Sequence, residues 1–192
     1  MTKMKGWGAI LAILVLAVGG LVMLFANNGS ISSLMGSCPV CNISTPSVGN
    51  SEVYFCPEDH CGDQLISKIN SAQTTVDIAI YSFTHDGLGA AVIAAKQRGV
   101  SVRVVFDNDQ AANDYSEDEK FMAEGILVKK RNGSGYMHNK FTVIDGNFVA
   151  TGSFNYSANA DEKNDENLIF LWSKDLAAKY TAEFEELWAQ SN

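Results

Sequence analysis

Hydrophobic and polar positions follow three different patterns along the chain. Residues 6–26 are apolar and uncharged, whereas the segment after them is rich in Ser, Gly, Asn and Pro and has no periodicity. From residue 51 onward, short runs of β-branched and aromatic residues alternate with stretches that have the apolar spacing of a helix. We therefore predict an N-terminal apolar segment in residues 1–28, a linker in residues 29–50 and one folded domain in residues 51–192.

The apolar segment has the length of a membrane span. At a rise of about 1.5 Å per residue, a helix over residues 6–26 is about 30 Å long, which matches the hydrocarbon core of a bilayer. A buried core helix is the alternative, but it would normally have a polar face, and this segment has none. Leu24-Phe25-Ala26 fits the small-x-small cleavage pattern poorly, so we favour an uncleaved transmembrane anchor over a signal segment that is removed.

The charges beside this segment predict its orientation. Lys3 and Lys5 precede it, and the next charged residue of either sign is Glu52. Positive residues remain on the cytoplasmic side of a membrane helix. We therefore expect a single-pass anchor with its N-terminus in the cytoplasm and the folded domain on the extracytoplasmic side.

The pattern of residues 51–192 predicts an α/β domain. Strands are expected at residues 52–55, 76–81, 101–106, 126–130, 140–144, 148–151 and 167–172. Helices are expected at residues 64–72, 87–98 and 116–124, and a final helix after a capping serine, Ser173. Asp145-Gly146-Asn147 is a strong hairpin turn, so the sheet should be mixed rather than purely parallel. We expect a mixed β-sheet flanked by helices on both faces, preceded by the N-terminal membrane helix.

Four cysteines lie in the linker and at the start of the domain: Cys38, Cys41, Cys56 and Cys61. The CxxC spacing of the first pair and the neighbouring His60 resemble a small structural zinc site, with Cys56 and His60 or Cys61 completing the ligands. An even number of cysteines outside the cytoplasm is equally typical of disulfides. The predicted orientation favours disulfides, and in either case the cysteines would attach the linker to the domain.

The charge balance restricts how the protein can bind a polyanion. The formal net charge is −8, so non-specific binding of nucleic acid by the whole surface is excluded and any positive charge must be local. Lys129-Lys130-Arg131 is the one basic run in the chain. It is either a substrate-binding segment or a solvated strand end, and the sequence alone does not separate the two.

One group of polar residues lies on the predicted hairpin. His138 and Lys140 are two apart at the start of a strand, so both side chains point to the same face. Ser153 and Asn155 are also two apart, just beyond the partner strand. A neutral imidazole can act as a nucleophile, while an ammonium and an amide can hold phosphate oxygens. The alternative is a surface turn capped by Ser and Asn, but two such pairs on one hairpin favour a phosphodiester site.

The string HxKxxxxD followed by GSxN resembles the signature motif of the phospholipase D superfamily. It is intact here in six residues: His138, Lys140, Asp145, Gly152, Ser153 and Asn155. Most superfamily members carry the motif twice, whereas this chain has one copy. In this respect it is similar to the small bacterial endonucleases of the family and to the mitochondrial-surface nuclease zucchini. The resemblance therefore implies a homodimer in which two motifs face each other.

The resemblance also implies roles for the site residues. His138 of one subunit would attack phosphorus, and His138 of the other would protonate the leaving oxygen. Lys140 and Asn155 would cradle the phosphate, with a hydroxyl contact from Ser153. Glu166 would orient the imidazole, and Asp145 would brace the hairpin turn. No metal or other cofactor would be needed for catalysis.

Three functions are compatible with this sequence. A nuclease acting on DNA or RNA is the first. A lipid phosphodiesterase of the phospholipase D type is the second, and the membrane segment favours it. Its chemistry would be the same as that of a nuclease, so the motif does not separate these two functions. A non-catalytic nucleic-acid-binding module is the third, but binding alone would not require His138. We expect the partners to be a second copy of the chain, a nucleic acid substrate, and a membrane reached through the N-terminal helix.

Overall fold

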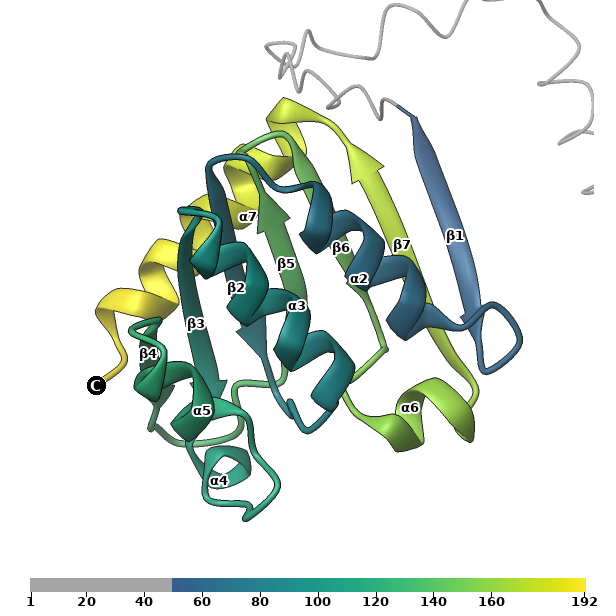
Figure 1. Cartoon of the computed structure of the whole chain (residues 1–192). Helices are drawn as coiled ribbons and strands as arrows, with labels where there is room; N and C mark the ends of the chain where they lie inside the picture. The colour runs from purple at the N-terminus through teal and green to yellow at the C-terminus, as the bar shows by residue number, and fades with distance from the viewer. Residues whose placement is uncertain (1–49) are drawn as a thin grey trace, which may run out of the picture. The chain divides into compact units, whose positions relative to one another are not determined.

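The computed structural model describes residues 50–192 (Figure 1). The predicted membrane segment and orientation, nearly all of the predicted linker, and Cys38 and Cys41 lie outside the described residues. Within residues 50–192, no helix combines the length and the apolar character that a membrane crossing requires.

A single mixed sheet of seven strands organises the described residues. Its order is β1-β7-β6-β5-β2-β3-β4 (Figure 1). β2 pairs in parallel with β3, and β3 with β4, whereas all the other neighbours are antiparallel. The strand bounds are β1 Ser51–Cys56, β2 Thr75–Ile80, β3 Ser101–Asp107, β4 Leu127–Arg131, β5 Lys140–Ile144, β6 Phe148–Gly152 and β7 Glu166–Trp172. The prediction of a mixed sheet is confirmed, with strand ends displaced by one residue at most.

Helices cover both faces of the sheet. α2 (Cys61–Ser71) and α3 (Asp86–Gln97) pack side by side on one face, and α7 (Lys174–Ala189) crosses the other (Figure 1). Two separate apolar clusters result, one between the sheet and α2 and α3, the other between the sheet and α7. Strand β2 lies between the two clusters and is buried from its second residue onward. Such double coverage is why this strand has a continuous apolar pattern.

Three shorter helices complete the fold. α5 (Asp118–Ala123) lies within the predicted 116–124 segment, whereas α4 (Asn108–Ala111) and α6 (Ala158–Glu162) were not predicted. Helices of four or five residues are too short to show apolar periodicity. Their starts do carry a recognisable signal, because side chains of Asp107 and Ser157 accept hydrogen bonds from the first free backbone N–H groups.

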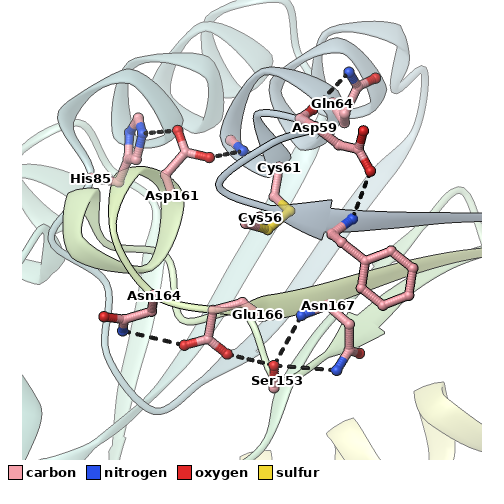
Figure 2. The surroundings of a disulfide bond; sticks show 12 residues. Cys56, Asp59, Cys61, Gln64, His85, Ser153, Asp161, Asn164, Glu166 and Asn167 are labelled. Atoms are coloured by element: carbon pink, nitrogen blue, oxygen red, sulfur yellow. Dashed lines mark hydrogen bonds and ion pairs between the residues drawn. A yellow bond between two sulfur atoms is a disulfide. The ribbon is translucent and has the colours of Figure 1, made fainter.

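A disulfide joins Cys56, the last residue of β1, to Cys61, the first of α2 (Figure 2). The prediction of disulfides is confirmed for this pair, and the zinc alternative is wrong for these two cysteines because their sulfurs are bonded to each other. His60 lies between them in sequence and is the N-cap residue of α2, with a positive φ of 50°. Among the described residues, no three His, Cys, Asp or Glu side chains are grouped to hold a metal ion. The bond joins the edge strand to the first helix within the domain, so the prediction that the cysteines attach the linker to the domain is wrong for this pair.

Candidate active site

The predicted catalytic residues other than Asp145 lie at one edge of the sheet. β2, β3 and β4 end at this edge, whereas β5 begins there, so the residues before β5 meet the residues after β2. The antiparallel neighbours place the end of β6 and the start of β7 at the same edge. Ligands of open α/β sheets bind outside the carboxyl ends of the parallel strands. Strand topology therefore brings together residues that are distant in sequence.

His138 and Lys140 are in direct contact. The Lys140 ammonium lies 3.1 Å from Nδ1 and 3.4 Å from Nε2 of the imidazole, and it donates to the His138 carbonyl oxygen at 3.0 Å. An ammonium can only donate, so this contact requires an unprotonated ring nitrogen. His138 is exposed while Lys140 is 8% exposed. The arrangement presents the imidazole to solvent with the Lys140 side chain held behind it.

The Lys140 ammonium is buried without a counter-charge. Its Nζ lies 5.2 Å from the centre of the Tyr81 ring, and no carboxylate of residues 50–192 approaches it within 4.0 Å. Burial lowers the pKa of Lys140, and the more distant charge of Glu166 opposes this only in part. A buried cation without an anion is costly. The site is therefore set to receive a negatively charged group.

Ser153 occupies the centre of a hydrogen-bond network at the ends of β6 and β7 (Figure 2). Its hydroxyl donates a short hydrogen bond to Glu166 and accepts from the backbone N–H of Asn167 at 3.1 Å. Gly152 lets the end of β6 lie close to the backbone of Asn167 in β7. A Cβ at Gly152 would lie 2.2 Å from the Asn167 carbonyl oxygen, and the φ of Gly152 is +153°. The predicted contact of Glu166 with His138 is not among the hydrogen bonds of residues 50–192, where Glu166 contacts Ser153 and Asn164.

Asn155 has an unmatched buried acceptor. Its backbone carbonyl accepts from the Ser157 N–H at 2.8 Å, but its side-chain Oδ1 is buried and finds no partner among the described residues. Nearly all buried polar atoms in folded proteins are hydrogen-bonded, and exceptions concentrate at functional sites. This oxygen can therefore accept from a protonated group that enters the site, whereas a phosphate oxygen would be bound by the side-chain N–H of the same amide.

Asp145 lies at the other end of β5 and does not join the site. Its carboxylate accepts from the backbone N–H groups of Gln73, Thr74 and Thr75 at 3.0, 2.7 and 3.0 Å, and from the Thr74 hydroxyl. Burial raises the pKa of Asp145, but these hydrogen bonds outweigh it and hold the pKa below its ordinary value. Five strand residues separate Asp145 from the His138 side of β5, which is about 20 Å. These contacts agree with the predicted role of bracing the hairpin.

Replacing Asp145 by Ala is expected to lower the free energy of unfolding by about 2–4 kcal/mol, because several charge-assisted hydrogen bonds are lost together. Since the pKa of Asp145 is lowered by folding, its stabilisation is complete above the ordinary carboxyl pKa and disappears as the pH falls through the lowered value. Urea unfolding at pH 7 and pH 3 measures both effects. Asp114→Ala, an exposed carboxylate, is the control. Equal loss of stability at both pH values would contradict this explanation.

Two members of the predicted basic run are already engaged within the chain. Lys129 donates to the carbonyl oxygens of Trp188 and Ser191, both at 2.9 Å, and so holds the end of α7. Lys130 pairs with the buried carboxylate of Asp118 at 2.7 Å. Because both lysines have partners within the chain, they are not a solvated strand end. Their ammonium groups are bound to these partners and are not directed toward His138 and Lys140. Both contacts point to a structural role for these lysines.

The other two histidines do not supply a second imidazole to the site. His85 precedes α3, where its Nδ1 accepts from the Leu88 N–H at 3.2 Å, and its Nε2 lies 3.5 Å from the Asp161 carboxylate (Figure 2). His60 lies beside the disulfide. Among the described residues, His138 is therefore the one imidazole in contact with Lys140, which leaves the general acid and the nucleophile without separate residues in one chain.

Three residues that contact the site were not predicted. The Tyr81 ring lies 4.4 Å from that of His138 and 5.7 Å from that of Tyr136. The Asp107 carboxylate accepts from the Met137 N–H at 2.9 Å and so fixes the segment that leads to His138. Tyr81 ends the predicted strand 76–81, and Asp107 directly follows the predicted strand 101–106. These positions at strand ends were the sequence signal that could have identified the two residues. Recognising them required the order of the strands, which local periodicity does not give.

These groups together fit the chemistry of a phosphodiester. An exposed imidazole stands next to a buried ammonium, with a hydroxyl and an unmatched amide at the neighbouring strand ends. Of these groups, the ammonium and the amide N–H can donate to phosphate oxygens, and preorganised donors stabilise the charge that develops there in the transition state. The imidazole can form the bond to phosphorus. A complete site still needs a proton donor for the leaving oxygen.

Comparison with known proteins gives a consistent result. A family model described as cardiolipin synthase, PLD-like domain, matches residues 65–188. Mitochondrial cardiolipin hydrolase of Chlamydomonas reinhardtii is 33% identical over 151 residues, which cover 74% of this chain and 68% of that protein. The protein of the same name from Xenopus tropicalis is 35% identical over 138 residues, covering 70% of this chain and 66% of that protein. The matched region is thus about two thirds of the length of these relatives.

Solved structures of similar fold include two bacterial proteins. Nuc from Salmonella typhimurium, described as a phospholipase D family member, superimposes with a TM-score of 0.71 at 29% identity. The match covers 74% of this chain and 96% of that chain. NucT from Helicobacter pylori superimposes with a TM-score of 0.69 at 28% identity, covering 74% of this chain and 97% of that chain. The described domain thus corresponds to nearly the whole of these two proteins.

Proposed function

The chain belongs to the phospholipase D superfamily, as a single-motif hydrolase of phosphodiester bonds, and we propose that it is a homodimeric endonuclease. In this proposal it cleaves DNA or RNA without a metal ion, through a phosphohistidine intermediate. The observation that carries the proposal is the exposed imidazole of His138 in contact with a buried ammonium that has no carboxylate partner in residues 50–192. A phosphate is the anion that completes this pair.

The reaction has two balanced steps. His138 attacks phosphorus with the lone pair of its ring nitrogen, and the bond between phosphorus and the leaving oxygen breaks. His138 of the partner subunit gives its proton to that oxygen. Water then attacks the phosphohistidine, His138 of the partner subunit takes a proton from the water, and the phosphorus–nitrogen bond breaks. Both imidazoles return to their starting states.

The other site residues would hold the phosphate and its surroundings. The Lys140 ammonium and the Asn155 side-chain N–H of both subunits donate to the non-bridging oxygens, and the Ser153 hydroxyl is held by Glu166. Two Lys140 ammonium groups within one cleft would repel each other in the absence of an anion. Substrate binding and subunit pairing therefore support each other.

A lipid phosphodiesterase is the second candidate. It is supported by the relatives named mitochondrial cardiolipin hydrolase and by the apolar character of residues 1–28. Against it stands the hollow beside His138, which is small, open and half polar, whereas an acyl chain needs a long apolar channel. In either case we propose that residues 1–28 attach the enzyme to a membrane, with the catalytic domain on the extracytoplasmic side.

One assay separates these functions and tests the role of metal. The full-length chain in detergent is offered plasmid DNA, single-stranded DNA, RNA and cardiolipin vesicles, each with EDTA and with magnesium. We expect cleavage of at least one nucleic acid, with rates that agree within about twofold in the two buffers, because the site uses cationic side chains in place of a metal. Cleavage of cardiolipin alone would favour the second candidate. Activity that disappears in EDTA and returns with magnesium would contradict the mechanism.

A further inference from the structure

A hollow lies next to His138, formed by the loop that leads from β4 into β5. Its volume is about 160 Å³, and its walls come from residues 133–139 together with Arg131 and Leu187. A cavity of about 150 Å³ holds one benzene-sized ring. The hollow therefore has room for a single ring system beside the imidazole.

One wall of this hollow is an exposed aromatic ring. Tyr136 is 66% exposed, so its ring is accessible to a ligand in the hollow. Its ring meets that of Tyr81 edge to face at 5.7 Å, and Tyr81 in turn lies 4.4 Å from His138. Aromatic side chains thus form a row from the imidazole outward. Nucleobases stack on such rings irrespective of sequence.

Another residue that lines the hollow is a cation held by neutral groups. Arg131 donates from Nη1 to the Asn132 carbonyl at 2.6 Å and from Nη2 to the Gln190 side chain at 2.9 Å. No carboxylate of residues 50–192 lies within 4.0 Å of it. Arg103, by contrast, is paired with Asp77 and Glu185. Arg131 is therefore oriented yet keeps its full charge for an external anion.

A glycine and a backbone hydrogen bond shape this loop. A Cβ at Gly133 would lie 2.4 Å from Nη1 of Arg131, which is the far end of a flexible side chain and could move aside. Gly135 has a φ of +102°, which side chains rarely tolerate. The Met137 N–H is fixed by Asp107 at the far end of the loop. The sequence thus specifies the shape of the hollow rather than leaving it to a flexible loop.

We propose that this hollow is a subsite for the nucleotide next to the scissile phosphate. Its base stacks on Tyr136, and the following phosphate binds Arg131. The inference rests on the proposed nuclease function and adds the part of the substrate that the enzyme recognises. A single aromatic wall, a free guanidinium and room for one ring match a nucleotide. An acyl chain would not find the length of apolar channel that it needs.

The test measures binding without turnover. The full-length chain with His138→Asn is titrated with a fluorescent single-stranded DNA octamer, and the anisotropy gives Kd at several salt concentrations. Adding Tyr136→Ala should raise Kd about tenfold, whereas Tyr136→Phe should change it less than about twofold, because the ring is retained. Arg131→Gln should reduce the slope of log K against log salt by about 0.7, the value for one phosphate contact on a single strand.

Tyr115→Ala is the matched control, since Tyr115 is 79% exposed and lies outside the hollow. Its Kd should equal that of the parent. Equal affinity of Tyr136→Ala and Tyr136→Phe would overturn the subsite, as would weaker binding of Tyr136→Ala to cardiolipin vesicles with DNA binding unchanged. Cleavage of nucleic acid by the wild-type chain is measured separately, so loss of the subsite proposal would leave the nuclease proposal standing. Absence of any DNA binding and cleavage would remove both.

Discussion

The variant His138→Asn is expected to lose at least about 10⁴-fold in phosphodiester turnover while its melting temperature changes by less than about 2 °C. Removing a catalytic nucleophile costs up to about 10⁶-fold in well-studied hydrolases. His138 is exposed, and its contacts are with the Lys140 ammonium and the Tyr81 ring, so little apolar burial is lost. Initial rates on the preferred nucleic acid and thermal unfolding of the same preparation measure the two effects.

Mixing the variant with the wild-type chain tests whether both imidazoles serve one reaction. If each site uses His138 from two subunits, a mixed dimer is inactive. After subunit exchange, one quarter of the dimers in an equal mixture carry two intact chains. The mixture then keeps about one quarter of the activity that pure wild type shows at the same total protein concentration. A complete site within each subunit would instead leave one half. Sedimentation at the assay concentration must show dimers, and a fully active monomer would rule out the shared site.

The sheet and the residues of the motif were predictable from the sequence. Strand β5 was predicted with the observed bounds because Lys140–Ile144 combines β-branched and aromatic residues with a strong turn directly after it. Gly99 and Gly125 end two predicted helical segments and have positive φ values of 92° and 71°. Such signals are local, since they depend on a few neighbouring residues. Local propensity and global fold agree at these positions.

Contacts between distant segments were less predictable. Tyr81 approaches His138 because β2 pairs with β5, and Lys129 holds α7 because that helix ends beside β4. Neither partner can be found from spacing along the chain. Glu166 illustrates the same limit, since its role toward His138 was inferred from a resemblance and the described chain directs it to Ser153. Side-chain partners therefore depend on the order of strands, which has no local signature.

The variant Lys140→Met is expected to lose at least about 10³-fold in kcat/KM and yet to be as heat-stable as the wild type or more so. Loss of one preorganised donor to a developing charge typically costs about 10²–10³-fold, and the substitution removes one donor from each subunit of a shared site. The Lys140 ammonium is 8% exposed, has no carboxylate within 4.0 Å among residues 50–192, and has a pKa lowered by burial. Folding therefore buries a charge with hydrogen bonds but without an anionic partner, and a methionine of similar shape removes that cost.

Phosphate provides the decisive comparison for Lys140. An anion that binds the ammonium in the folded state but not in the unfolded state should raise the Tm of the wild type as its concentration increases. The same anion should leave the Tm of Lys140→Met nearly unchanged. Lys68→Met is the matched control, because Lys68 is partly exposed, contacts Glu52 and lies on α2. It should keep both the activity and the response to phosphate. A lower Tm for Lys140→Met, together with an undiminished response to phosphate, would show that Lys140 stabilises the fold and that the anion binds elsewhere.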